Sequence, residues 1–237
     1  MNKHNLFLQG LIDGLPICFG YISVAFAFGI FSVGSGLDII QAVLISATNV
    51  TSAGQFAAVP IICSGGTLIE LAASQFIINL RYALMSVSLS QKLDDKVGVK
   101  DRLIISFVNT DEVFAVASAK EGQVGKKYLY GLILTPFIGW TFGTLLGAGA
   151  GSILPASVVS ALGMAIYAMF IAIVFPHVKK ERPVALCVLS AIILSCLFKY
   201  ASFLKSVPTG FSIIICAVLS SGFFAYLYPV EEANDNE

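Results

Sequence analysis

Charged residues are scarce in this chain. Only 12% of its 237 residues are Asp, Glu, Lys or Arg, whereas 57% are hydrophobic and the mean hydropathy is +0.88. A soluble domain carries about 25% charged residues, so this chain cannot cover a water-facing surface in the usual way. Its length leaves room for roughly seven or eight spans of about 20 residues, which predicts a single polytopic membrane domain over 1–237.

Sequence motifs for enzymatic or metal chemistry are also missing. The chain has no HExxH motif and no phosphate-binding glycine motif, and its two histidines lie far apart in the sequence. The cysteines form no CxxC pair and lie in or beside apolar runs, as small packing residues do: Cys18, Cys63, Cys187, Cys196 and Cys216. We therefore expect no enzyme, no cofactor and no metal site.

Long apolar runs dominate what is present. Six of them are long enough to cross a bilayer as helices: 15–33, 67–89, 128–148, 158–175, 184–204 and 211–228. A polar start over 1–13 precedes the first run, and an acidic tail over 231–237 follows the last. The sequence thus predicts an all-α integral membrane protein with about six full spans.

Two further segments, 38–64 and 103–119, are apolar at their ends and polar in the middle. The polar interruptions fall at 48–55 and 109–112. Backbone at membrane depth can leave the helix only where protein or a wet cavity satisfies its polar groups. The pattern predicts two broken-helix or re-entrant segments, and paired breaks are typical of a transporter whose substrate site is lined by discontinuous helices.

The distribution of basic residues predicts how these two segments enter the membrane. Three loops carry several Lys and Arg, whereas the other turns carry none; the basic loops are 90–102, 120–127 and 177–182. All three share the cytoplasmic face with both termini if 38–64 enters from outside and 103–119 enters from the cytoplasm. The alternative, in which 103–119 crosses the membrane, stays open. The two interruptions also resemble each other loosely, which would fit an inverted repeat or arise by chance.

The first interruption offers the start of a half-helix. Thr51 and Ser52 are suitable N-caps for a helix through Gln55, and a helix start presents free N–H groups and the positive end of a dipole. At membrane depth this start would suit a carboxylate, and Gly54 would let a ligand approach the backbone. We take these residues and Asn49 as candidate substrate-binding residues. The alternative is a packed kink whose polar side chains satisfy the backbone.

Arg81 lies past the middle of the span 67–89, too deep for easy snorkelling. A buried guanidinium in a membrane is costly and usually has a partner, and its fork geometry matches a carboxylate. The partner is either the substrate or one of the acidic residues Asp111 and Glu112. We include Arg81 among the candidate substrate-binding residues, together with Asn79 two positions away.

Asp111 and Glu112 are adjacent carboxylates at membrane depth. Burial and like charge would favour proton uptake by one of them, which suits proton coupling. The alternative is local, because Asn109 as N-cap with Glu112 three positions later matches a capping box. The coupling role and a structural ion pair or cap both stay open.

A glycine repeat marks the span 128–148 and the residues after it. One face of this helix is lined with small residues at every fourth position, Gly139, Gly143, Gly147 and Gly151. Such a face permits close contact with another helix. The repeat does not say whether that helix belongs to this chain or to a partner subunit.

Several stretches together resemble the AzlC family of branched-chain amino-acid exporters. They are 14–21 (GLPICFGY), 27–29 (AFG), 52–56 (SAGQF), 79–84 (NLRYAL), 110–112 (TDE) and 168–176 (AMFIAIVFP). Some relatives carry an Asp shortly after the position of Gly163, where this chain has no carboxylate over 164–167, so no acidic role carries over there.

The resemblance implies an exporter of branched-chain and similar hydrophobic amino acids in the bacterial cytoplasmic membrane. It also implies a partner, a small AzlD-type membrane subunit. For the side chain of such a substrate we expect Phe56 and Phe107 as apolar neighbours. Two other classes of protein fit the residues: a small-solute channel with paired re-entrant segments, and an accessory subunit of a transport complex.

Overall fold

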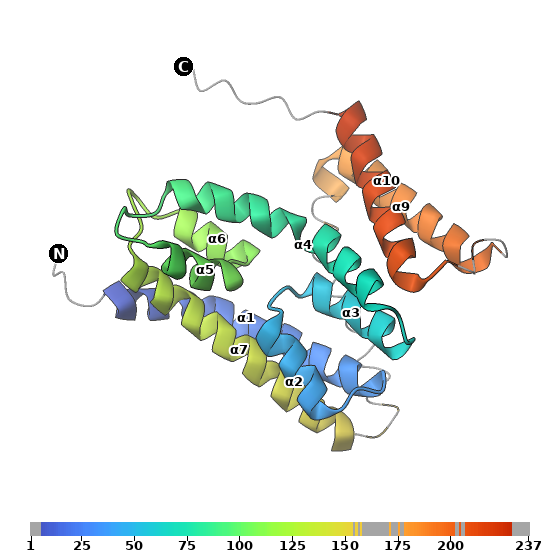
Figure 1. Cartoon of the computed structure of the whole chain (residues 1–237), viewed down its shortest axis with the longest axis horizontal. Helices are drawn as coiled ribbons and strands as arrows, with labels where there is room; N and C mark the ends of the chain where they lie inside the picture. The colour runs from blue at the N-terminus through green and yellow to red at the C-terminus, as the bar shows by residue number, and fades with distance from the viewer. Residues whose placement is uncertain are drawn as a thin grey trace.

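The computed structural model describes residues 6–153, 155, 157, 171, 175, 178–201, 204 and 207–228. The named elements within these residues are all helices, which confirms the all-α fold (Figure 1). They are α1 (Leu6–Gly34), α2 (Ile39–Thr48), α3 (Ala53–Cys63), α4 (Leu68–Gln91), α5 (Val99–Phe107), α6 (Asp111–Ser118), α7 (Lys126–Ile153), α9 (Arg182–Tyr200) and α10 (Thr209–Leu227).

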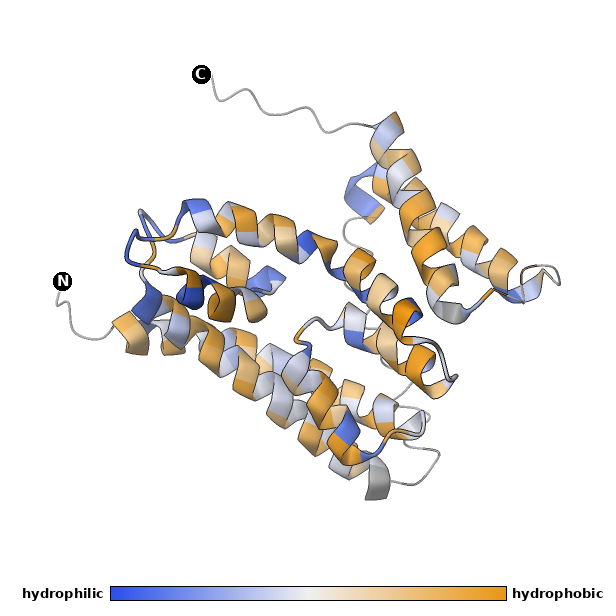
Figure 2. Ribbon diagram, viewed as in Figure 1, coloured by the Kyte–Doolittle hydropathy of each residue, from blue (hydrophilic) through white to orange (hydrophobic). Residues whose placement is uncertain are grey.

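Five of these helices are long and apolar enough to cross a membrane: α1, α4, α7, α9 and α10. They match five of the six expected spans. The sixth expected span, 158–175, lies outside the described residues except for two positions, and so does the acidic tail over 231–237. Hydrophobic residues run along these helices, and hydrophilic residues gather in the loops beside the end of α4 (Figure 2).

The first helix begins at Leu6, so it includes most of the expected polar start. Its single charged residue, Asp13, is compensated within the fold. The Lys120 ammonium lies 2.7 Å from the Asp13 carboxylate, and the Tyr128 hydroxyl donates to it at 2.8 Å. Because these partners neutralise the charge and satisfy the carboxylate, the helix can extend across a position that the sequence alone marks as polar.

Both interrupted segments are broken helices, as the sequence predicts. Asp38 caps α2 in a capping box with Gln41, and α2 ends before the first break at 49–52. In this break Ser52 has a φ of 43°, the single positive φ among the described non-glycine residues. The second break separates α5 from α6 at 108–110. The polar interruptions therefore mark the places where the chain leaves the helix.

The second broken segment, α5 and α6, starts and finishes at the same end of the molecule. Leu93 before α5 pairs with Val124 after α6 in an isolated parallel bridge. Nearby, the Tyr130 hydroxyl and the Lys126 ammonium bind Asp101, which holds the pKa of that carboxyl below its usual value. The first broken segment, α2 and α3, returns to the opposite end, where α1 finishes and α4 begins (Figure 1).

The glycine repeat packs α7 against α1. A Cβ built on each glycine of this face would meet a residue of α1, from Cys18 at Gly139 through Ile22 and Phe26 to Ile30 at Gly151. The steps are equal on both helices, so α1 and α7 run parallel in one register. The close contact is therefore internal to this chain, which answers the question that the sequence left open.

The C-terminal helices α9 and α10 form a hairpin that reaches the rest of the fold mainly through α4 (Figure 1). Glu70 in the first turn of α4 makes the link. Its buried carboxylate accepts a hydrogen bond from the Gly210 N–H at the start of α10. A helix N-terminus is a favourable place for a carboxylate, so this contact fixes the hairpin to α4.

We predict that Gly147→Ala destabilises the protein by about 1–3 kcal/mol, because overpacking forces helices apart. The added Cβ would lie 2.0 Å from the Phe26 carbonyl oxygen. Gly149→Ala on the same helix is the matched control, since a Cβ there meets nothing within 4 Å. Thermal unfolding in detergent should show a lower midpoint for the first variant and no loss for the second. Equal midpoints would contradict the packing argument.

The arrangement of the second broken segment predicts a labelling pattern. In a cysteine-free background, Gln91→Cys and Gln123→Cys should react with an impermeant thiol reagent from the same side of the membrane. Both positions are exposed and flank the bridge between Leu93 and Val124. Ser64→Cys, in the exposed turn before α4, should react from the other side. Labelling of Gln91→Cys and Gln123→Cys from opposite sides would show that 103–119 crosses the membrane.

Candidate functional site

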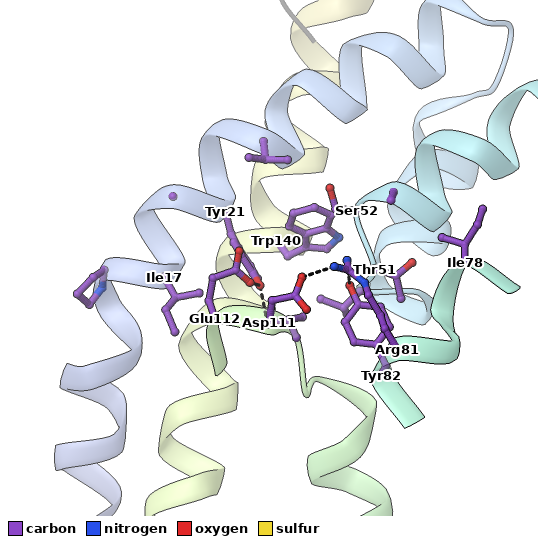
Figure 3. A pocket seen from close by; sticks show the side chains of 16 residues that line it. Ile17, Tyr21, Thr51, Ser52, Ile78, Arg81, Tyr82, Asp111, Glu112 and Trp140 are labelled. Atoms are coloured by element: carbon purple, nitrogen blue, oxygen red, sulfur yellow. Dashed lines mark hydrogen bonds and ion pairs between the residues drawn. The ribbon is translucent and has the colours of Figure 1, made fainter. Parts of the chain in front are cut away.

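A cavity of about 660 Å³ lies where the two breaks meet α1, α4 and α7 (Figure 3). Its apolar wall includes Ile17, Val24, Val50, Ile78 and Trp140. Its polar lining includes Tyr21, Thr51, Ser52, Arg81, Tyr82, Thr110, Asp111 and Glu112. The fold thus brings together five predicted site residues that stand far apart in the sequence.

An ion pair crosses the polar part of the cavity. Arg81 Nη1 lies 2.6 Å from Asp111 Oδ2, so α4 and the start of α6 are joined by opposite charges. Their side chains are 51% and 45% exposed, which leaves both within reach of a ligand. Tyr82 supports the guanidinium, since Arg81 Nη2 donates to the Tyr82 hydroxyl at 3.0 Å and the ring lies 4.8 Å away.

Glu112 is held by a different wall of the cavity. The Tyr21 hydroxyl donates to Glu112 Oε2 at 2.5 Å and lies 2.6 Å from Thr110 Oγ1. These contacts tie α1 to the start of α6. The two adjacent carboxylates therefore have separate partners, Arg81 for one and Tyr21 for the other.

The capping box that the sequence leaves open as an alternative at this break does not form. Thr110, rather than Asn109, occupies the N-cap position of α6, and its side chain makes no capping hydrogen bond. The Asn109 amide instead donates to Ser86 Oγ on α4 at 3.2 Å. Because the helix starts one residue later than expected, Glu112 stands too early in α6 to close a capping box and faces Tyr21 instead.

The start of α3 opens on the cavity through Thr51, Ser52 and Ala53. Ser52 occupies the predicted N-cap position, but its side chain makes no capping hydrogen bond. Thr51 Oγ1 donates to Asn49 Oδ1 at 2.8 Å instead of capping the helix. With no side chain capping it, this helix start presents positive partial charge to the cavity.

Gly54, Asn49 and Asn79 lie behind the cavity wall rather than on it. A Cβ on Gly54 would lie 2.6 Å from Gln75 Oε1 and 3.2 Å from Asn79 Nδ2. Gln75 Nε2 donates to the Gly54 carbonyl, and Gln75 Oε1 accepts from both asparagines at 3.2 Å. The glycine thus lets α4 approach α3 closely, and Gln75 joins the Gly54 carbonyl to the two asparagine side chains.

Gln55 is fully buried and positions the cavity wall. Its Nε2 donates to Ser46 Oγ at 2.9 Å, and Ser46 contacts Thr144 Oγ1 at 2.6 Å. Its Oε1 accepts a 2.7 Å hydrogen bond from the indole of Trp140. The side chain therefore joins α2, α3 and α7, and holds the Trp140 ring against the cavity.

The expected apolar neighbours of a substrate are placed elsewhere. Phe56 is buried against Phe28, with ring centroids 5.3 Å apart, and Phe107 is half-exposed on another surface. Tyr21 and Trp140 line the cavity instead, in an edge-to-face contact with centroids 5.0 Å apart. The sequence held one signal for each: Tyr21 ends the stretch 14–21, and Trp140 is the only tryptophan.

The cavity combines groups suited to binding a small molecule with both charged and apolar parts. It offers one guanidinium, two carboxylates, an uncapped helix start and an apolar wall. Within the described ranges, no three His, Cys, Asp or Glu side chains gather where they could hold a metal ion.

Comparison with known proteins identifies the family. The family model described as "AzlC protein" matches residues 16–154. The inner membrane protein YgaZ of Escherichia coli K12 is 30% identical over 79% of this chain and 78% of its own length. An uncharacterized membrane protein of Archaeoglobus fulgidus is 34% identical, over 76% and 79%. No solved structure gives a significant match. The chain belongs to the AzlC family, and its relatives and apolar helices make it a membrane protein.

Proposed function

We propose that this chain is a secondary transporter that exports branched-chain and similar hydrophobic amino acids across the bacterial cytoplasmic membrane. Membership of the AzlC family supports a transport role. The observation that carries the proposal is the cavity, in which two helix breaks, Arg81, two carboxylates and an apolar wall meet. Transporters bind substrate at such meetings of broken helices.

The substrate carboxylate binds Arg81 and the start of α3 at Ser52. Both lie on the cavity, and a guanidinium and a helix N-terminus each favour a negative group. The aliphatic side chain contacts Ile17, Val24 and Ile78 in place of the phenylalanines that the sequence suggested. Asn49, Gly54, Gln55 and Asn79 support this site from behind through the contacts described above.

A small AzlD-type membrane subunit is the proposed partner, and both termini of the chain are proposed to be cytoplasmic. Two other classes of protein remain as competitors. Two broken segments that meet at a cavity also occur in small-solute channels, which transport without saturation or counterflow. Transport retained when this chain is expressed without the partner would exclude an accessory subunit.

The proposal predicts faster efflux of preloaded radiolabelled leucine, isoleucine or valine from cells that express this chain with its small subunit. Arg81→Ala should abolish the gain, because it removes the carboxylate ligand and leaves Asp111 without its partner. Arg102→Ala is the matched control, since Arg102 lies at the start of α5, away from the cavity lining, and donates to the Val97 carbonyl. Membrane expression is measured for each variant.

Unchanged efflux in the Arg81→Ala variant would contradict the proposed site. Absence of efflux even with the partner would contradict amino-acid export. External unlabelled leucine distinguishes a carrier from a channel, because only a carrier shows saturable exchange that accelerates with substrate on the far side.

Proton coupling is proposed for Glu112 or Asp111. Glu112→Gln keeps the shape of the side chain and removes the ionisable group beside Tyr21. We expect efflux by this variant, by Asp111→Asn or by both to lose its dependence on pH. The measurement is the initial efflux rate at several external pH values with the membrane potential clamped. Normal pH dependence in both variants would exclude coupling through this pair of carboxylates.

A further inference from the structure

The three charged side chains on the cavity wall have different partners. Glu112 is bound by Tyr21 and lies beside Thr110 on the α1 side. Arg81 and Asp111 bind each other across the cavity at 2.6 Å, and about half of each side chain is exposed. Of the three charges on the cavity, one cation and one anion are therefore already in contact, and the third, Glu112, is bound by Tyr21.

We infer that the Arg81–Asp111 ion pair opens to take up a free amino-acid zwitterion, with the ligand carboxylate on Arg81 and the ligand ammonium on Asp111. This inference rests on the proposed function and goes beyond it. It assigns Asp111 as the ammonium ligand and makes the resting ion pair the competitor of the substrate. It also separates the roles of the two acidic neighbours, since Glu112 stays bound to Tyr21 and holds neither charge of the ligand.

Charge balance decides which ligands enter. A zwitterion adds one positive and one negative charge, so Arg81 and Asp111 each keep an opposite partner after the pair has opened. A ligand with a single charge binds one member of the pair and leaves the other unpaired at membrane depth. An unpaired charge in such surroundings is costly, and an intact ion pair is the better alternative. The cavity therefore rejects singly charged analogues that have the same apolar part.

The geometry also limits the separation of the two ligand charges. The guanidinium comes from α4 and the carboxylate from the first residue of α6, and they start in contact. A ligand with both charges on one carbon can replace each partner after a small displacement of the side chains. A ligand with its charges at opposite ends of a chain would need one of them to lie against the apolar wall formed by Ile17, Val24 and Ile78.

The test is competition for radiolabelled leucine binding to the full-length protein, purified with its small subunit. The competitors are unlabelled leucine, 3-methylbutylamine, 4-methylpentanoate and 6-aminohexanoate. Quenching of Trp140 is a parallel readout, since it is the only tryptophan of the chain and lies on the cavity. We expect each of the last three compounds to compete at least about tenfold more weakly than leucine.

Two variants should reverse this selectivity. Asp111→Asn removes the negative charge, so 4-methylpentanoate now restores balance at Arg81 and should bind more tightly than leucine. Arg81→Gln removes the positive charge, so 3-methylbutylamine should be preferred at Asp111. Asp101→Asn, which breaks the surface pair with Lys126, is the matched control and should keep the selectivity of the unmodified protein.

The outcomes separate this inference from the proposed function. Leucine binding with equal competition from the singly charged analogues would overturn the zwitterion inference and leave amino-acid transport standing. Unchanged selectivity in both Asp111→Asn and Arg81→Gln would do the same. Absence of leucine binding by both readouts would overturn the proposed function, and the inference with it.

Discussion

Polar groups at a helix break in apolar surroundings must find hydrogen-bond partners within the protein, and this constraint shapes the centre of the fold. At the first break, Gln75 of α4 binds the Gly54 carbonyl and the amide of Asn49. At the second, the side-chain amide of Asn109 donates to the Ser86 hydroxyl, also on α4. Both breaks therefore depend on polar residues of one neighbouring helix, and that same helix supplies Arg81 to the cavity between them.

The glycine face of α7 makes this arrangement geometrically feasible. Because α1 and α7 approach without intervening side chains, Tyr21 and Trp140 stand close enough for an edge-to-face contact on the cavity wall. Gln55 then hydrogen-bonds the Trp140 indole from the other side. An uncharged backbone packing feature thus sets the position of the aromatic wall against which a ligand would lie.

The sequence predicted features that follow from local composition, namely the two breaks, the apolar spans and a carboxylate partner for Arg81. Prediction from the sequence fails where a contact depends on which residues meet in three dimensions. The sequence suggests that Gly54 lets a ligand approach the backbone, whereas in the structure this glycine lets α4 approach α3. Phe56 turns away into a buried aromatic cluster, while Trp140, with no motif of its own, reaches the cavity. Helix period places a residue on a face, but only the packing says what that face meets.

The fold separates a rigid frame from one tethered helix start, that of α6. The frame of α1 and α7 is held by backbone contacts along its length, which resist small displacements. The start of α6 is joined to the frame by the Tyr21–Glu112 hydrogen bond and to α4 by the Arg81–Asp111 ion pair. Side-chain contacts of this kind can exchange partners without repacking a core, whereas a helix interface cannot. A ligand that replaces one of them therefore changes the restraint on α6, and this links occupancy of the cavity to movement of the broken segment.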